Sequence, residues 1–202
     1  FHLDHGNGLD PYRVGATIGL GAPGLMVGNE LVYPYCYKTH KILDNGPLRF
    51  TVELTYNPTI VVDQKNVIEH RIISLDKGSN FNKMTVWYDG LTHPTDFVTG
   101  VPIHEEDTET KTLAKDYVSY ADPTDNIENN SQVYVGVLFP DGIDETYYQL
   151  FDTKHDGATG HILGLHRALK SGEKFSYYFG AAWSKYDVRS YAEWQLRIKG
   201  FM

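Results

Sequence analysis

The clearest hydrophobic pattern in the chain is a strict alternation over residues 48–56. Apolar side chains occupy every second position, and the positions between them are polar: Leu48, Phe50, Val52, Leu54 and Tyr56 against Arg49, Thr51, Glu53 and Thr55. Successive side chains of a β-strand point to opposite faces. The pattern therefore predicts a half-buried strand with one wet face, preceded by a turn at Asp44-Asn45-Gly46-Pro47.

Seven further segments are predicted to be strands because they are short and rich in β-branched and aromatic residues. They are residues 67–75, 81–88, 117–120, 132–139, 147–151, 161–169 and 175–183. Glycine-containing turn sequences separate them: Asp76-Lys77-Gly78-Ser79, Asp89-Gly90, Asp141-Gly142, Asp156-Gly157 and Ser171-Gly172. Many short strands joined by regular turns predict an all-β fold, either an antiparallel β-sandwich or an open, curved version of one.

One helix is predicted, close to the C-terminal end of the chain. Ser190 and Glu193 have the spacing of a capping box, and Tyr191, Trp194 and Ile198 fall on one helical face. We expect this aromatic face to pack on the sandwich.

Two polar stretches are predicted to be solvated loops. Residues 122–130 contain Asp122, Asp125 and Glu128, but their spacing is not that of an EF-hand calcium loop. Residues 104–107 read His-Glu-Glu-Asp and are also interpreted as a solvated segment.

The size and charge of the chain limit what it can be. With 202 residues, it suits a single domain, residues 1–202, that is long enough to bury a core. The net charge of -8 argues against a nucleic-acid partner or an anionic membrane. No apolar run approaches the roughly 20 residues that a membrane-spanning helix needs.

The cysteine content and the first residue bear on the origin of the chain. Cys36 is the only cysteine, which excludes an internal disulfide and a cysteine-based zinc cluster and is compatible with the bacterial periplasm. The chain begins at Phe1, without an initiating Met or a signal peptide. We therefore expect it to be a processed or truncated chain, and half of a binding cleft could then be missing.

Two motif searches give negative answers. Residues 19–24 match the dinucleotide-binding pattern G-x-G-x-x-G by letter, but they continue through Pro23 into a strand or hairpin rather than a helix, which excludes a Rossmann site.

The nine histidines contain no short-range zinc motif. His2 and His5 are close in sequence, but a third ligand would have to come from a distant residue such as His70, His104 or His161. Neither a metal nor another cofactor is predicted.

The densest set of reactive side chains lies in residues 1–24. It consists of His2, Asp4, His5, Asp10, Tyr12 and Arg13. These groups cover most of the side-chain chemistry for proton transfer and anion binding, and the glycines between them allow tight turns and close approach of a ligand. The alternative is a polar chain terminus whose side chains only cap turns.

Two aromatic segments are candidates for binding sugar rings. Tyr33, Tyr35 and Tyr37 recur at period two, so in an extended segment all three project to one side; the alternative is a stripe of the core. Trp183 beside Lys185 suits an acidic sugar, whose ring would stack on the indole while its carboxylate pairs with the ammonium. The alternative is a strand end with a snorkelling lysine.

His161 and His166 lie on opposite faces of the predicted strand 161–169, with His161 in register with Leu163 and Leu165. One of the two is expected to enter the sandwich interior or its concave face. The alternative for each is a hydrogen-bonded structural histidine.

Several stretches together resemble a family of secreted bacterial proteins classified as a domain of unknown function. They are residues 5–24, Gly46-Pro47-Leu48-Arg49, residues 78–81, residues 97–101 and residues 175–185. The resemblance runs over most of the chain and implies a curved β-sandwich similar to the supersandwich of sugar mutarotases and polysaccharide lyases. It also implies a place among polysaccharide-degradation genes, a periplasmic or secreted location, and a chain that is the C-terminal half of a protein twice as long.

A member of that family from an ulvan-degrading system is an oligosaccharide dehydratase acting on uronic-acid ends, which implies an acidic oligosaccharide as the partner here. Dehydration needs a base for the proton beside the carboxylate, an acid for the leaving hydroxyl and a cation for the developing charge. We assign His5 as the base, Tyr12 as the acid, Arg13 or Lys185 to the carboxylate, and His161 as a reserve for either proton-transfer role. Asp10, Tyr35 and Trp183 complete the substrate-binding set.

Three alternatives stay open from the sequence. A non-catalytic glycan-binding protein would use Tyr35 and Trp183 without any chemistry. A mutarotase or epimerase would share the acid and the base but release no water. A glycoside hydrolase is disfavoured, because no pair of carboxylates stands out at a strand end.

Overall fold

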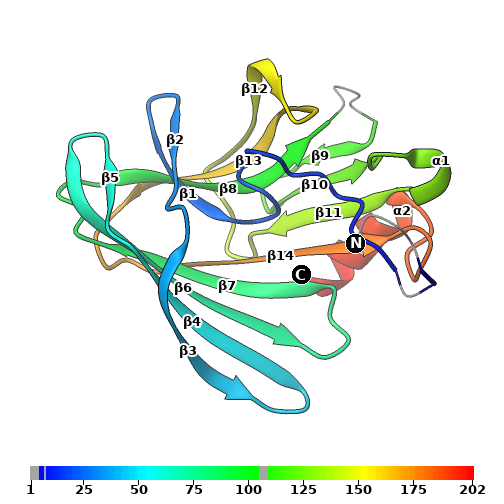
Figure 1. Cartoon of the computed structure of the whole chain (residues 1–202), viewed down its shortest axis with the longest axis horizontal. Helices are drawn as coiled ribbons and strands as arrows, with labels where there is room; N and C mark the ends of the chain where they lie inside the picture. The colour runs from blue at the N-terminus through cyan, green and yellow to red at the C-terminus, as the bar shows by residue number, and fades with distance from the viewer. Residues whose placement is uncertain (1–4, 7, 105–108) are drawn as a thin grey trace.

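The computed structural model describes residues 5, 6, 8–104 and 109–202 and shows two antiparallel sheets packed face to face (Figure 1). The strands are β1 (Pro23–Val27), β2 (Glu30–Val32), β3 (Tyr37–Asn45), β4 (Arg49–Tyr56), β5 (Thr59–Val61), β6 (Gln64–Asp76), β7 (Phe81–Asp89), β8 (Thr95–Ile103), β9 (Lys111–Leu113), β10 (Tyr117–Asp122), β11 (Val133–Leu138), β12 (Glu145–His155), β13 (Ala158–Leu169) and β14 (Phe175–Trp183). The helices are α1 (Ile127–Asn130) and α2 (Tyr191–Phe201).

The two sheets differ in size. The small sheet has the strand order β12-β13-β8-β1-β2, and the large sheet has the order β3-β4-β6-β7-β14-β11-β10-β9, with β5 paired to β6. The prediction of a curved, antiparallel all-β sandwich with a short C-terminal helix is confirmed.

The glycines of the predicted turns adopt the backbone conformation that such turns require. Gly78, Gly90, Gly142, Gly157 and Gly172 all have positive φ angles, between 76° and 91°. Residues with a Cβ rarely adopt this conformation, so glycine is the residue that closes these turns at little cost. The positions of these turns could therefore be predicted from the sequence.

The core lies between the inner faces of the two sheets. Phe97 and Val101 of β8 and Ile162 of β13 face Val86 of β7 and Tyr177 of β14, and all five are buried. Alternate residues along each strand supply this layer, as expected for a sandwich whose strands each have one core-facing side.

Helix α2 covers the outer face of the large sheet. Its N-cap is Ser190, whose Oγ accepts a hydrogen bond from the backbone N–H of Glu193 (3.2 Å), as predicted. Trp194 and Ile198 are fully buried, and the Trp194 ring stacks on Phe81 of β7 with ring centroids 5.1 Å apart. Neither helix in the described part of the chain is long and apolar enough to cross a membrane.

The prediction for residues 48–56 is correct for the strand and wrong for its burial. Strand β4 and its neighbour β3 curl away below the small sheet (Figure 1), so no second layer covers their inner side. Phe50 is 39% exposed although it lies on the predicted core face. Thr51 on the other face is buried, with its Oγ1 hydrogen-bonded to Ser74 Oγ (3.0 Å). We call β3 and β4 the overhang of the large sheet. In this overhang the two faces of the strands no longer differ as a buried face and a solvent-exposed face.

Strand β8 was not predicted from the sequence because it contains Gly100 and Pro102, and both residue types are unfavourable inside a strand. Its partner β1 pairs only with Asp96–Thr99, so Pro102 lies beyond the end of β1, where the missing N–H costs no ladder bond to that strand. A Cβ on Gly100 would lie 2.0 Å from the carbonyl oxygen of Ile162 in β13, so the close approach of the two strands requires glycine there.

Candidate functional site

A buried histidine–carboxylate pair lies where β8 ends and β10 ends. His104 Nδ1 donates a hydrogen bond to Asp122 Oδ2 over 2.6 Å, and Asp122 is only 1% exposed. The other carboxylate oxygen, Oδ1, accepts from the backbone N–H of Thr124 (2.8 Å). Because both oxygens are held, the carboxylate fixes the orientation of the imidazole and places the proton on Nδ1.

The second ring nitrogen of His104, Nε2, is buried. Nε2 has no hydrogen-bond partner among the described residues. A neutral imidazole with its proton on Nδ1 exposes a lone pair on Nε2, which is the arrangement of a general base. The pair therefore has the geometry of an oriented acid–base group.

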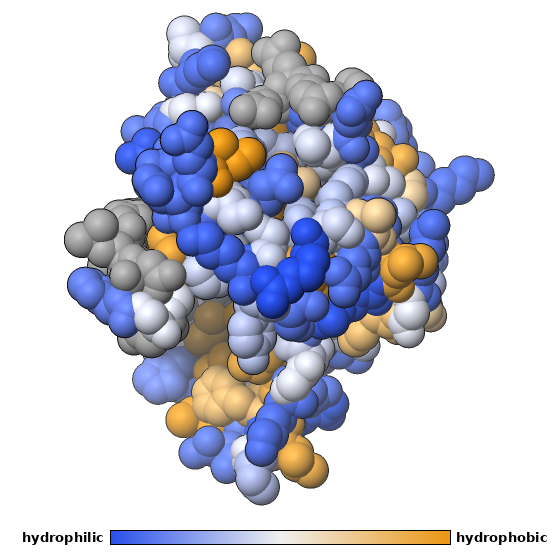
Figure 2. Space-filling model, turned by 90° about the vertical axis from the view of Figure 1, so that its right-hand side faces the viewer, coloured by the Kyte–Doolittle hydropathy of each residue, from blue (hydrophilic) through white to orange (hydrophobic). Residues whose placement is uncertain are grey.

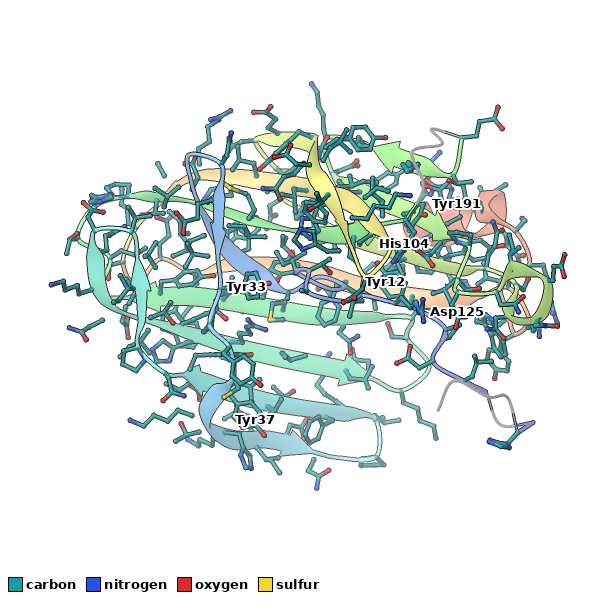
Figure 3. All side chains as sticks on the ribbon, turned by 45° about the horizontal axis from the view of Figure 1, so that its top comes forward. Tyr12, Tyr33, Tyr37, His104, Asp125 and Tyr191 are labelled. Atoms are coloured by element: carbon teal, nitrogen blue, oxygen red, sulfur yellow. The ribbon has the colours of Figure 1, made fainter. Side chains whose placement is uncertain are left out.

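Two tyrosines surround this pair. The Tyr12 ring meets the His104 ring edge-on with centroids 6.3 Å apart, and Figure 3 shows the two side chains next to one another. The Tyr120 hydroxyl accepts from the backbone N–H of His104 (3.3 Å). Burial, followed by the nearby Asp122 and Tyr120, raises the pKa of the Tyr12 hydroxyl well above its ordinary value, so this phenol keeps its proton.

The same inner face carries Trp183. Asp122 pairs with Val133, and Val133 pairs with Trp183 on the next strand, so the three side chains project to one face. Two strand spacings of about 4.8 Å separate Asp122 from Trp183. The Trp183 Nε1 donates to the carbonyl oxygen of Asn130 (2.7 Å), which fixes the ring against the α1 segment.

Three cations lie around this end of the sandwich. Arg13 follows Tyr12 and is exposed. Lys111 of β9 is buried, with its Nζ 5.4 Å from the centre of the Tyr120 ring. Lys185 lies 5.5 Å from the Trp183 ring centre and donates to the carbonyl oxygen of Asn129. We call the set Tyr12, His104, Asp122, Trp183 and these cations the end site.

Figure 2 shows the molecule from the right-hand side of Figure 1. Hydrophilic residues cover most of this view, and hydrophobic side chains gather around a hollow in its lower half. The exposed apolar residues of the overhang and of its neighbour β6 include Ile42 of β3, Phe50 of β4 and Leu75 of β6. The end site and the exposed apolar surface of β3, β4 and β6 therefore lie in different parts of the molecule.

The structure places the sequence-predicted residues in several regions. Tyr12, Arg13, Trp183 and Lys185 belong to the end site. His5 and Asp10 are exposed in the N-terminal segment. Tyr35 is completely exposed in the bend between β2 and β3, away from the end site, and the row of rings at residues 33–37 is not a single extended strand. The roles assigned to these residues stay predictions, while His2 and Asp4 lie outside the described residues.

His161 lies on the outer face of the small sheet, on the same side as Leu163. It is 2% exposed, and both ring nitrogens are engaged: Nδ1 donates to Gln149 Oε1 (3.0 Å), and Nε2 accepts from the backbone N–H of Ile18 (3.2 Å). Burial, with a smaller effect from His155, lowers the pKa of His161 to about 4. Of the two histidines, His166 is the one that faces inward, stacking on Phe175 at 4.7 Å.

We predict that His161 makes stability depend on pH. Its pKa is about 4 in the folded chain and 6.5 ordinarily, so the unfolded chain takes up the proton first as the pH falls. The contribution of neutral His161 to the free energy of unfolding is therefore fully present above pH 6.5. As the pH falls towards 4, this contribution of about 3 kcal/mol is lost. Urea unfolding at pH 7 and pH 4.5 should show a smaller pH-dependent loss for His161→Gln than for the wild type.

The exposed His40 provides the control for that measurement. His40→Gln should leave the pH dependence of the unfolding free energy as it is in the wild type. An equal pH dependence in His161→Gln and the wild type would contradict the neutral, buried state of His161.

Sequence reasoning missed His104, Asp122 and Lys111 as site residues. His104 was assigned to a solvated loop and considered only as a distant metal ligand, and Asp122 was assigned to a solvated acidic loop; both assignments are wrong, because these two side chains are paired and largely buried. They are 18 residues apart, and no short motif links them. The described residues contain no group of three or more His, Cys, Asp or Glu side chains arranged to hold a metal.

The chain is similar to other proteins as follows. A family model described as a domain of unknown function, DUF4861, matches residues 1–202. "Uncharacterized protein P7" of Formosa agariphila is 25% identical over 206 residues, which cover 100% of this chain and 49% of that protein. The chain therefore spans about half the length of this relative. No solved structure matches the chain.

Proposed function

The chain belongs to the DUF4861 family of domains of unknown function, and we propose that it acts in polysaccharide degradation as a dehydratase on uronic-acid ends of oligosaccharides. The observation that carries this proposal is the His104–Asp122 pair, whose buried Nε2 has no hydrogen-bond partner among the described residues. A carboxylate-oriented imidazole is a common general acid–base group, and elimination beside a carboxylate requires one.

The proposed reaction begins at the carbon that carries the carboxylate. His104 Nε2 removes the proton from this carbon, and the electron pair of the broken C–H bond becomes the new carbon–carbon double bond. The C–O bond at the neighbouring carbon breaks, and the leaving hydroxide takes a proton to depart as water. Tyr12 lies beside His104 and holds its proton, so it is the proposed donor.

Charge and stacking at the end site support an acidic substrate. Removing the proton places negative charge on the substrate carboxylate, which a nearby cation stabilises. Lys111, Arg13 and Lys185 are the candidates, and the Trp183 ring would stack on a sugar. The base is reassigned here from His5 to His104, because His104 is oriented by a buried carboxylate whereas His5 is exposed.

The setting of the protein is part of the same proposal. A role in polysaccharide use implies export, so we propose a periplasmic or secreted location. Since the Formosa relative is about twice as long, we also propose that a further region of the polypeptide completes the substrate cleft.

Ultraviolet absorbance tests the proposal directly. Uronic-acid oligosaccharides are incubated with this chain and, in parallel, with the longer polypeptide, and the absorbance of a conjugated enoate is followed. A rise is the expected result. A rise with the longer polypeptide alone would show that the second region contributes to the site. No rise with either protein would exclude elimination of these substrates.

A glycan-binding protein without chemistry is the second candidate, and a separate groove on the outer face of the small sheet favours it. This candidate predicts binding by calorimetry without any absorbance change. A mutarotase or epimerase predicts a change in optical rotation without absorbance, which the same samples can report.

A further inference from the structure

A groove lies on the outer face of the small sheet. It has a volume of about 660 Å³ and lies between the β1–β2 turn and strand β12. We call it the outer groove. Its volume falls within the range of about 300–1,000 Å³ that is typical of ligand sites.

On the side of the outer groove that β12 forms, aromatic side chains alternate with an amide side chain. Tyr147, Gln149 and Phe151 occupy every second position of this strand, so their side chains share one face. Tyr147 packs on the apolar cluster of Leu163 and Leu165 on that outer face. The ring faces and the amide are therefore presented together, which suits a ligand with alternating apolar and hydroxyl-bearing surfaces.

The groove is held in shape by contacts that Gln149 and Phe151 make with neighbouring residues. Gln149 accepts from His161 Nδ1 (3.0 Å), and its own Nε2 donates across the groove to the carbonyl oxygen of Asn29 (3.5 Å). The Phe151 ring meets the His161 ring at 90° with centroids 4.8 Å apart. Because His161 is buried and neutral, it gives both residues a fixed support, and a preformed site loses less entropy when a ligand binds.

The charge of the lining distinguishes the outer groove from the end site. Among the described residues that line it, Asp152 is the only carboxylate, and there is no lysine or arginine. A polyanionic sugar chain would meet no compensating cation there, and Asp152 would repel it. The lining therefore favours a neutral chain over an acidic one.

We propose that the outer groove binds a neutral oligosaccharide. Sugar rings stack on Tyr147 and Phe151, and their hydroxyls bond to Gln149 and to the turn at Asn29. The β12–β13 turn connects the two regions: His155 lines the groove, and a Cβ on Gly157 would lie 3.7 Å from His104 Cδ2. The groove would thus hold a neutral part of a polysaccharide beside the end site.

Calorimetry with neutral and acidic hexasaccharides tests the outer groove. The neutral panel is β-1,4-linked glucose, xylose and mannose, and the acidic probe is a galacturonate hexamer. We expect a neutral member to bind, and Phe151→Ala to weaken its binding by at least about fivefold. Phe50→Ala removes a ring from the overhang of the large sheet and should leave this affinity unchanged.

Two further variants complete the test. The first keeps the test valid if Phe151→Ala does not fold, and the second separates binding in the outer groove from the proposed reaction. Asn29→Lys, in an exposed turn, adds a cation and should raise the affinity for the galacturonate hexamer. His104→Gln should strongly slow the absorbance change at the end site without affecting neutral-chain binding. The proposal is overturned if no neutral probe binds, or if neither Phe151→Ala nor Asn29→Lys changes binding in folded protein.

Discussion

Replacing His104 with glutamine is expected to lower the rate of uronate elimination by about 10²–10⁴-fold, the usual contribution of a general acid–base group. Glutamine can still donate an N–H to Asp122 Oδ2, so the buried carboxylate keeps a partner. It has no basic nitrogen to replace Nε2. The measurement is the initial rate of absorbance increase with saturating substrate, with the melting temperature recorded for each variant.

Asp122→Asn extends this prediction to the residue that orients the base. The amide keeps the shape of the side chain but cannot hold the His104 proton on Nδ1 as the carboxylate does. We expect a rate loss that does not add to that of His104→Gln, because the two residues act as one unit.

An exposed histidine–carboxylate pair provides the matched control. His93 Nε2 lies 3.3 Å from Asp63 Oδ1, and both side chains are at least half exposed. His93→Gln should retain full activity. His5→Ala tests the assignment made from the sequence: full activity in His104→Gln together with a loss in His5→Ala would restore His5 as the base.

Replacing Arg71 with methionine is expected to destabilise the fold by about 3–5 kcal/mol, the cost of leaving a buried charge unpaired. Arg71 Nε donates to Glu69 Oε1 over 2.5 Å, and their side chains are only 12% and 2% exposed. The guanidinium also lies 4.3 Å from the centre of the Tyr56 ring. Burial raises the pKa of Glu69 even with Arg71 beside it, so without Arg71 the carboxylate would have to take up a proton or remain charged in the core.

An exposed ion pair between β4 and β6 provides the comparison for this prediction. Arg49 bonds both oxygens of Asp76 (2.5 and 2.7 Å), but their side chains are 55% and 50% exposed. Solvent screens such a pair, so Arg49→Met should destabilise the fold much less than Arg71→Met does. The free energies come from urea unfolding at pH 7.

The double variant Glu69→Gln with Arg71→Met gives the decisive comparison. Removing both charges should recover part of the loss seen for Arg71→Met alone, because no unpaired carboxylate remains. Similar small losses for Arg71→Met and Arg49→Met would show that the buried pair is not the charge-sensitive element that its burial indicates.

Local patterns in the sequence were enough to predict most of the fold. Strand periodicity, glycine at positive-φ turns and the Ser190 cap depend on residues close together in the chain, and β4, β6, β7 and α2 were all predicted from them. The strand or hairpin expected after Pro23 is present as β1 and β2, whereas strands β3, β5, β8 and β9 were not predicted. Strand β8 contains glycine and proline at positions that only its pairing partners make acceptable.

The sequence by itself determined an all-β chain, its turns, its final helix and a reactive N-terminal segment that includes Tyr12. Only the tertiary structure decided that His104 and Asp122 meet, that Glu69 and Arg71 are buried, and that His161 has both nitrogens occupied. The physical reason is that these contacts depend on strand register and on which layer covers each face. Both are set by burial over the whole sandwich rather than by neighbours in the sequence.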